Sequence, residues 1–436
     1  MTAPHPGGPA PSGVQAAYDV IVVGAGLAGL FAGALAARRG ARTLVIGRGL
    51  GGTHLGSGAI DVWGHTAAGL PAENPLAEAQ HLAGPGHPLT LAGWPALEGG
   101  LAELQGLSTA AGYPLEGQPD RNHFLPTALG AVRPTCLAPQ SFVAGELRES
   151  TELALGQFAG FRDFFADYAV ANLNAAGHAA RAVSLELPYG PTRRDAFATD
   201  LARLLDRDSY RASAAQLWRP ALKGVARLGL PAVLGVGEAM AAWGDLSEKL
   251  GVALFEIPLL PPSVPGMRLF SLLQSALEEA RGRLIVGPRV SGWVEAGRVQ
   301  GIVAATAGGP RRYHAAHVIL ATGGFRHGGL ECPTVGQARE TVFDLPVTTG
   351  PDWFAPVYWG QHPYARFGVR VNAALQPLNT DGEAIYDNIH AIGGLLAGAD
   401  RHGEGSREGI DLATAYKAVQ QIALPAGTGA TERKPA

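Results

Sequence analysis

Cysteine is scarce in this sequence of 436 residues, which contains only Cys136 and Cys332. Two thiols so far apart provide neither a disulfide framework nor the four thiolates that an iron–sulfur cluster needs. Charge is scarce as well, since charged residues make up 16% of the chain and the formal net charge is −3. A chain of this kind has no field that would attract nucleic acid or anionic lipid, so we expect small-molecule ligands.

Metal-binding and membrane-spanning patterns are also missing. The 13 histidines are scattered, without a His-Glu-x-x-His run or a Cys-x-x-Cys pair, so no metal site is predicted. Residues 20–37 carry no charge and have the hydropathy of a marginal membrane span. Three glycines at the spacing of a nucleotide-binding turn interrupt them, however, which favours a strand, a turn and a helix. Residues 1–13 have no Lys or Arg and no apolar core, which argues against a secretory signal. We therefore expect a cytoplasmic protein with no membrane span of its own.

A phosphate-binding turn stands near the start of the chain. The expected strand, helix and second strand around it lie at residues 18–24, 27–40 and 42–47. Gly24, Gly26 and Gly29 have the Gly-x-Gly-x-x-Gly spacing, in which the first glycine permits a tight turn, the second admits a phosphate and the third lets the helix pack on the strand. Together with Ala25, they are predicted to bind a dinucleotide or flavin phosphate at the helix N-terminus.

The acidic residue that normally completes this pattern is absent, because Gly47 followed by Arg48 ends the second strand. In a dinucleotide-binding unit this acid accepts hydrogen bonds from the adenosine ribose. Three explanations stay open: a dinucleotide bound without the contact, a backbone group that replaces it, or a ligand with no adenosine ribose. For a redox cofactor the last of these is FMN, which still needs the phosphate turn. FMN is therefore the predicted cofactor, with FAD as the alternative.

Two later segments match further elements of two-domain flavoproteins. The segment "ILATGG", residues 319–324, matches their Ala-Thr-Gly strand-to-loop element and predicts cofactor contacts from Thr322 and Gly323. The segment "NIHAIGG" resembles their second flavin motif and predicts contacts from Gly393 and Gly394, although Gly394 replaces the usual Asp. A helix expected from about Gly409 would point its positive N-terminus at the flavin.

The predicted fold class is α/β, a Rossmann-like flavin-binding domain of the two-domain FAD/NAD(P)-binding flavoprotein type with an inserted α+β substrate or cap domain. Amphipathic helical character is expected within the insertion, for example over residues 156–173. The predicted division is disordered tails at 1–16 and 425–436, a discontinuous flavin-binding domain at 17–69, 265–330 and 365–424, and an insertion at 70–264 joined by 331–364.

Taken together, the sequence resembles the B-subunit family of anaerobic glycerol-3-phosphate dehydrogenase over nearly the whole chain between the two tails. The segments that carry the resemblance are, in chain order, "VIVVGAGLAGL", "THLGSGAIDVWG", "LPTALGAVRPTCLAP", "GQFAGFRDFFADYAVANL", "LPPSVPGMRL", "VILATGGFRHGGL", "RFGVRV" and "NIHAIGGLLAG". One departure is residues 399–411, which contain no cysteine where the family has a Gly/Cys-rich stretch.

The resemblance implies a complex. In this family an FAD-containing A subunit and an FMN-containing B subunit form a catalytic pair. An iron–sulfur C subunit anchors them to the membrane and passes electrons to the quinone pool. The implied reaction is oxidation of sn-glycerol 3-phosphate to dihydroxyacetone phosphate in glycerol catabolism. The implied location is cytoplasmic, peripheral on the inner face of the cell membrane through a partner.

Flavin oxidation of a secondary alcohol phosphate needs a group that takes the hydroxyl proton and cations that hold the phosphate. His54 and His327 are the candidate bases, since both lie in loops close to predicted flavin contacts. Arg268 and Arg133 are the candidate phosphate ligands, because a guanidinium offers a fixed fork of donors. The remaining predicted flavin contacts, through hydroxyl and amide donors, are Ser57 and Gly58.

Two other functions are compatible with the same residues. The chain is then either an electron-relay subunit that binds flavin but never contacts substrate, or a stand-alone FAD oxidoreductase that acts on an organic acid, steroid or amine. Composition does not separate these alternatives from the catalytic subunit.

Overall fold

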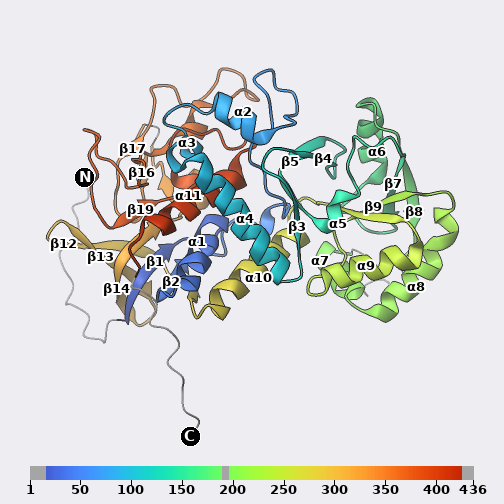
Figure 1. The fold of residues 1–436 in the computed structure, drawn as a ribbon, viewed down its shortest axis with the longest axis horizontal. Coiled ribbons are helices and arrows are strands. Elements are labelled where there is room, and N and C mark those ends of the chain that lie inside the picture. The colour runs from blue at the N-terminus through green and yellow to red at the C-terminus, as the bar shows by residue number, and fades with distance from the viewer. Residues whose placement is uncertain (1–15, 189–195, 335, 425–436) are drawn as a thin grey trace, which may run out of the picture.

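The computed structural model describes residues 16–188, 196–334 and 336–424. Two bodies of secondary structure lie next to each other, one built on a seven-stranded sheet and the other on a four-stranded sheet (Figure 1). The predicted tails at residues 1–16 and 425–436 lie outside the described residues, except that Ala16 begins a strand.

The larger sheet joins the two ends of the described chain. Its strands lie in the order β11-β2-β1-β14-β13-β12, and β19 pairs with β14 on a separate branch. The first four strands in this order are parallel, as is the β14–β19 pair, whereas β14, β13 and β12 are antiparallel. The strand bounds are β1 Ala16–Val23, β2 Thr43–Gly47, β11 Arg283–Val286, β12 Val290–Glu295, β13 Arg298–Thr306, β14 Gly309–Leu320 and β19 Ile389–Ala391. The predicted sharing of one sheet by early and late segments is confirmed.

Four helices pack around this sheet and against one another: α1 Leu27–Arg38, α4 Trp94–Ala110, α10 Val264–Glu279 and α11 Arg407–Gln421 (Figure 1). The first of them is buried on all sides, with every residue from Leu27 to Ala37 buried. A helix that is apolar all round belongs in the interior of a protein. The uncharged run at residues 20–37 is therefore a strand, a turn and a core helix, as predicted.

The second body is a parallel sheet in the order β10-β9-β7-β8, flanked by helices. Its elements are β7 Leu153–Phe158, α6 Ala166–Ala175, β8 Ala180–Leu185, α7 Ala198–Leu205, α8 Asp208–Trp218, β9 Arg227–Pro231, α9 Ala239–Leu250 and β10 Ala253–Ile257. Fully buried Trp218 stacks on Phe158 at 5.4 Å between ring centroids, at the centre of a separate apolar core.

The helical character expected over residues 156–173 is wrong for the first part of that range. Gly156 lies inside strand β7, and a helix begins only at Ala166. The error has a physical cause, because β7 is buried along most of its length and a buried parallel strand has no alternating pattern to distinguish it from an amphipathic helix.

The boundary between the two bodies lies later in the chain than residue 70. The leucines of α4, including Leu97, Leu101 and Leu104, pack in the core of the larger body. The core of the smaller body begins near Phe124 and ends at Val264. We propose that the insertion proper extends from β4 to the start of α10.

The remaining described elements are short. They are α2 Pro75–Leu82, α3 Pro88–Ala92, α5 Gln140–Val143, β3 Leu115–Gly117, β4 His123–Pro126, β5 Val132–Thr135, β6 Leu137–Pro139, β15 Leu330–Glu331, β16 Arg339–Glu340, β17 Val347–Thr348 and β18 Gly368–Val369, together with the 3-10 turns η1 Thr53–Leu55, η2 Arg219–Leu222, η3 Phe325–His327, η4 Pro363–Arg366 and η5 Gly393–Leu395.

Candidate cofactor and active site

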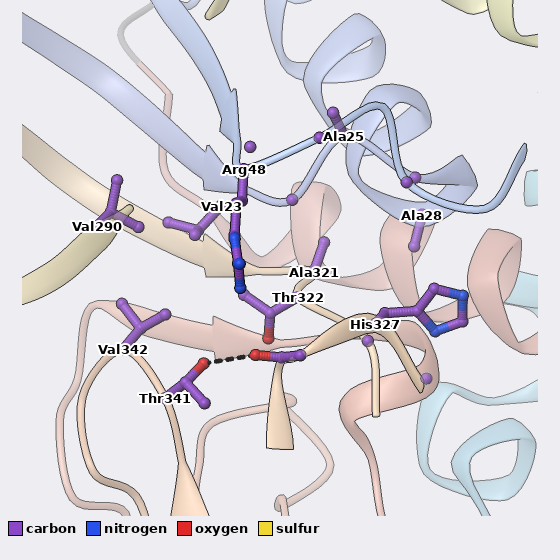
Figure 2. Close-up of a pocket in the computed structure, with 18 of the residues that line it drawn as sticks. Val23, Ala25, Ala28, Arg48, Val290, Ala321, Thr322, His327, Thr341 and Val342 are labelled. Carbon is purple, nitrogen blue, oxygen red and sulfur yellow. Dashed lines mark hydrogen bonds between the residues drawn. The ribbon is translucent and has the colours of Figure 1, made fainter. Parts of the chain in front are cut away.

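A large cavity opens where the parallel strands of the larger sheet end. Its volume is about 1370 Å³, above the roughly 300–1,000 Å³ of ordinary ligand pockets. Ligands of α/β sheets bind outside the carboxyl ends of the strands, and this cavity lies there (Figure 2). The lining comes from residues 23–28, 47–52, 288–290, 321–323, 326–328 and 339–344, together with Leu55, Gly292, Val294, Glu331, Gly394, Arg401 and Asp411.

The glycine turn after β1 forms one wall, and each glycine has the role that its spacing predicts. Gly24 has φ of +120°, and a Cβ there would lie 2.2 Å from the carbonyl oxygen of Ala321. A Cβ on Gly29 would lie 1.9 Å from the carbonyl oxygen of Gly24, so only glycine lets α1 approach the strand this closely. Gly26 has open space where its Cβ would be, and Ala25 lines the same wall. The open side of Gly26 is the cradle that a phosphate would fill.

The N-terminus of α1 points its free N–H groups into this cradle without a competing group. Gly26 is its N-cap and provides no side-chain hydrogen bond, and the first turn contains no acidic residue. The unpaired N–H groups and the helix dipole together favour a bound anion. The residues present therefore fit a nucleotide phosphate.

The loop after β2 packs tightly around residue 47, where the usual acid is missing. A Cβ on Gly47 would lie 3.0 Å from the carbonyl oxygen of Gly49 and 3.1 Å from Cβ of Ala25. Gly51 has φ of +71°, and a Cβ there would lie 2.5 Å from Cα of Gly26. Residues 47–52 thus fold back onto the phosphate turn. A side chain at residue 47 would make tight contacts with Gly49 and Ala25, and Arg48 lines the cavity next to it.

The loop after β14 forms the opposite wall. Thr322 lines the cavity, and its hydroxyl is buried with no hydrogen-bond partner among the described residues. Gly323 has φ of +74° and lies against His327. Gly394 lines the cavity as well, whereas Gly393 is buried beneath it, where its N–H donates to the hydroxyl of Thr414 at 3.0 Å. The unsatisfied Thr322 hydroxyl is a polar group that a bound cofactor would satisfy.

Charged side chains gather at the end of the cavity near α11. Arg401 donates to Asp411 at 2.5 Å and to the backbone carbonyl of Arg407 at 2.6 Å, and its Nε is buried without a partner among the described residues. Arg326 hydrogen-bonds His402 at 2.9 Å. Burial raises the pKa of Asp411 above its ordinary value, although Arg401 opposes the shift. This end therefore combines cations with the positive N-terminus of α11.

His327 stands at the same end, on the turn after Gly324 (Figure 2). Partial burial lowers the pKa of His327, and the positive charge of Arg401 lowers it further. Burial and the neighbouring arginines lower the pKa of His402 to about 4. Both imidazoles are therefore neutral at pH 7, and a neutral imidazole can accept a proton.

His54, Ser57 and Gly58 lie outside the cavity lining. The ring of His54 packs edge-on against Phe270 of α10, with centroids 6.4 Å apart. The Ser57 hydroxyl accepts from the N–H of Ala59, and a Cβ on Gly58 would lie 2.8 Å from Pro265. Their predicted contacts with flavin or substrate are not supported by these positions, because the segment that carries them packs against the start of α10.

Both predicted phosphate arginines make internal ion pairs outside the cavity lining. Arg268 is buried and donates to both carboxylate oxygens of Glu256, at 2.7 and 3.0 Å. Burial lowers the pKa of Arg268, but the adjacent Glu256 outweighs it and the pKa lies above its ordinary value. Arg133 donates to Asp61 at 2.6 Å. Neither guanidinium lines the cavity, so neither is placed to hold a substrate phosphate.

The sequence reasoning missed the arginines that do line the cavity. Arg48 directly follows Gly47, where the acid is missing, so the fingerprint itself could have predicted that Arg48 lies at the cavity. Arg326 is next to His327, and Arg401 lies in the segment considered only for its absent cysteines. Only the fold brings these two segments to one cavity wall.

Comparison with known proteins identifies the class to which this fold and cavity belong. The chain matches the FAD binding domain family over residues 19–409, and it belongs to that family, which makes it a flavin-dependent oxidoreductase with a Rossmann-like flavin-binding fold.

Particular relatives narrow the class. The chain is 33% identical to the probable B subunit of anaerobic glycerol-3-phosphate dehydrogenase from Halobacterium salinarum, over 92% of this chain and 96% of that one. It is 31% identical to the B subunit of anaerobic glycerol-3-phosphate dehydrogenase from Pectobacterium carotovorum, over 93% of this chain and 98% of that one. The resemblance to this B-subunit family is therefore confirmed.

Two solved structures are also similar. One is 3-ketosteroid Δ1-dehydrogenase from Sterolibacterium denitrificans, with 14% identity, a TM-score of 0.45, and coverage of 94% of this chain and 99% of that one. The other is the open form of a flavocytochrome c3 fumarate reductase, with 12% identity, a TM-score of 0.44, and coverage of 94% and 79%. Within residues 16–188, 196–334 and 336–424, no helix is long and apolar enough to cross a membrane.

Proposed function

We propose that this chain oxidises sn-glycerol 3-phosphate to dihydroxyacetone phosphate with a bound flavin. The observation that carries the proposal is that a phosphate turn, an unsatisfied Thr322 hydroxyl and a cationic end with a neutral histidine line one cavity. The reaction needs each of these parts, and relatives with at least 30% identity carry the name of this dehydrogenase.

The proposed chemistry divides between the cofactor and the chain. When bound, the flavin supplies the acceptor for the hydride that leaves the carbinol carbon. His327 takes the proton of the substrate hydroxyl on a ring nitrogen, since its lowered pKa keeps it neutral at pH 7. Arg326 and Arg401 hold the phosphate dianion, and Asp411 orients Arg401 through their ion pair.

Arg326 is the better of the two cations for a direct test. Its guanidinium bonds His402, whereas Arg401 is held by Asp411 and by the carbonyl of Arg407. Substitution of Arg401 would therefore disturb the wall of the cofactor cavity as well, and substitution of Arg326 would mainly remove a charge.

We propose FMN as the cofactor. Gly47 provides no acid for an adenosine ribose, and a side chain at residue 47 would crowd Gly49 and Ala25. The cavity continues past β2 to Val290 and Val342, so the adenylate half of FAD is not excluded by volume alone (Figure 2). Chromatography of heat-released flavin decides the matter: FMN is expected, and FAD at full occupancy would overturn the assignment.

We also propose that the chain acts in a complex, as the B subunit alongside an FAD-containing A subunit and an iron–sulfur C subunit that holds the pair at the inner face of the membrane and reduces quinone. The relatives are named as subunits, which supports partners of some kind. The two cysteines, Cys136 and Cys332, cannot supply an iron–sulfur cluster, so in the proposed complex the cluster belongs to another subunit.

One experiment tests the catalytic proposal. The flavin-loaded chain is mixed anaerobically with glycerol 3-phosphate, and the absorbance of oxidised flavin is followed. Bleaching by glycerol 3-phosphate but not by glycerol is expected. A chain that stays oxidised alone, and becomes reduced only when the A subunit has been added and shown to bind, would instead be an electron relay. A chain that stays oxidised in both cases would refute both functions.

A further inference from the structure

Arg48 is the first residue after strand β2, at the position just beyond the missing acid. Its side chain extends from the strand end across the cavity, past Val23 and toward Thr322 (Figure 2). Within the described part of the chain its guanidinium makes no hydrogen bond or ion pair. Arg326, Arg339 and Arg401 of the same cavity each bond another side chain, namely His402, Glu331 and Asp411.

The groups around Arg48 form a site for an anion. Gly26 leaves open space at the N-terminus of α1, whose first turn contains no acidic side chain. The Thr322 hydroxyl is buried, without a partner among the described residues, on the wall that Arg48 approaches. A guanidinium added to free helix N–H groups and a hydroxyl donor provides the donor set that a phosphate takes.

The exchange of an acid for an arginine at this strand end changes what the site recognises. A carboxylate accepts hydrogen bonds from ribose hydroxyls, whereas a guanidinium has only donors. Gly47 has no side chain to make that contact, and a Cβ there would lie 3.0 Å from the carbonyl oxygen of Gly49. A terminal phosphate monoester carries about −1.5 to −2 charges at pH 7 on one group, and so gains most from a nearby guanidinium.

We propose that Arg48 binds the phosphate of the flavin, and that it favours the terminal phosphate of FMN over the pyrophosphate of FAD. The phosphate contact rests on the flavin class of the chain, and the preference for FMN rests on the cofactor proposed above. Arg48 is then a specificity-determining residue that replaces the ribose-binding acid of the fingerprint.

The test uses the full chain freed of flavin and titrated with riboflavin, FMN and FAD, with flavin fluorescence as the readout. Riboflavin has no phosphate, so it isolates the contribution of that group. Arg48→Ala is expected to weaken FMN binding by roughly 10–100-fold, the loss of a charge-assisted hydrogen bond, and to leave riboflavin binding unchanged. Arg48→Lys should restore part of the loss, because it returns the charge without the fork.

Arg289→Ala is the matched control. Arg289 also lines the cavity, beyond the end of β11, and carries the same charge. It is expected to leave FMN binding within about twofold of wild type, as for a surface charge without a specific contact. Dependence of FMN affinity on salt should fall in Arg48→Ala and remain in Arg289→Ala.

Several outcomes would overturn the proposal. Equal losses of riboflavin and FMN in Arg48→Ala would show that Arg48 supports the loop and not the phosphate. Equal losses of FMN affinity in Arg48→Ala and Arg289→Ala would show that Arg48 contributes only to the overall positive charge of the cavity and makes no specific contact. If the wild type binds FAD more tightly than FMN, the selectivity is wrong even where the phosphate contact holds. A wild type that binds no flavin would refute the cofactor itself.

Discussion

Arg268, which sequence reasoning assigns to the substrate phosphate, is expected to control stability and not substrate affinity. Its guanidinium donates to Glu256 at 2.7 and 3.0 Å and to the backbone carbonyl of Gly235 at 2.9 and 2.6 Å. Arg268 lies on α10 of the larger body, and Glu256 lies on β10 of the smaller one. The pair therefore joins the two bodies through a buried contact.

The expected loss of unfolding free energy in Arg268→Ala follows from the contacts that would remain to Glu256. The Glu256 side chain is 0% exposed and would keep only two donors, the Ser141 hydroxyl and the N–H of Leu234, each at 2.8 Å. Removal of one partner of a buried pair costs about 3–5 kcal/mol, because the remaining charge is buried without compensation. Replacement of both residues by neutral ones, as in Arg268→Met with Glu256→Gln, should recover part of that loss.

Urea unfolding followed by circular dichroism measures the change, with Arg42→Ala as control. Arg42 also pairs with a carboxylate, Asp19, but its side chain is 67% exposed, so its loss should leave the urea midpoint nearly unchanged. For Arg268→Ala we expect a lower urea midpoint, with KM for glycerol 3-phosphate unchanged in the folded enzyme. A raised KM together with an unchanged midpoint would refute the reasoning and restore Arg268 to the substrate site.

The remaining predictions concern the cavity. His327→Asn should lower kcat roughly 10²–10⁴-fold. In the wild type, kcat/KM should fall as the pH drops below a midpoint under about 6.5, because the neutral base is the active form and its pKa is lowered. If the variant keeps the same fall in kcat/KM at low pH, His327 is not the base. Gly51→Ala should lose bound flavin, because φ is +71° and the new Cβ would meet Gly26, whereas Gly49→Ala, with open space around it, should keep full flavin-to-protein absorbance. Arg326→Ala should raise KM for glycerol 3-phosphate roughly tenfold or more with flavin content retained, and steady-state kinetics that match the wild type would contradict its role.

Local patterns predicted the backbone geometry of the glycine turn. The spacing of Gly24, Gly26 and Gly29 specified a turn, a cradle and a close helix contact, and the structure has all three. The absence of an acid at Gly47 predicted that the usual contact with an adenosine ribose is missing. These features depend on neighbours within a few residues, where the sequence and the geometry are directly linked.

The residues at the substrate end of the cavity could not be predicted from local sequence patterns. Nothing in the residues around Arg268 indicates that Glu256 faces it across a buried interface, and the partner of Arg133 lies far away at Asp61. An arginine in a loop has the same appearance in sequence whether it pairs with a carboxylate or lines a cavity. The choice is made by long-range packing, which also brings Arg401 to the cavity.

The pairing of β1 with β14 has a consequence for how the chain folds as it is made. Residues 16–23 must wait for residues 309–320 before this part of the sheet can form, and a ribosome adds about 5–20 residues per second. The four-stranded sheet, whose strands span residues 153–257, has its partners closer together and can close first. The apolar helix α1, buried on all sides in the finished protein, is meanwhile without its cover. The first strands synthesised are thus among the last to be secured, and chaperone dependence during synthesis should centre on them.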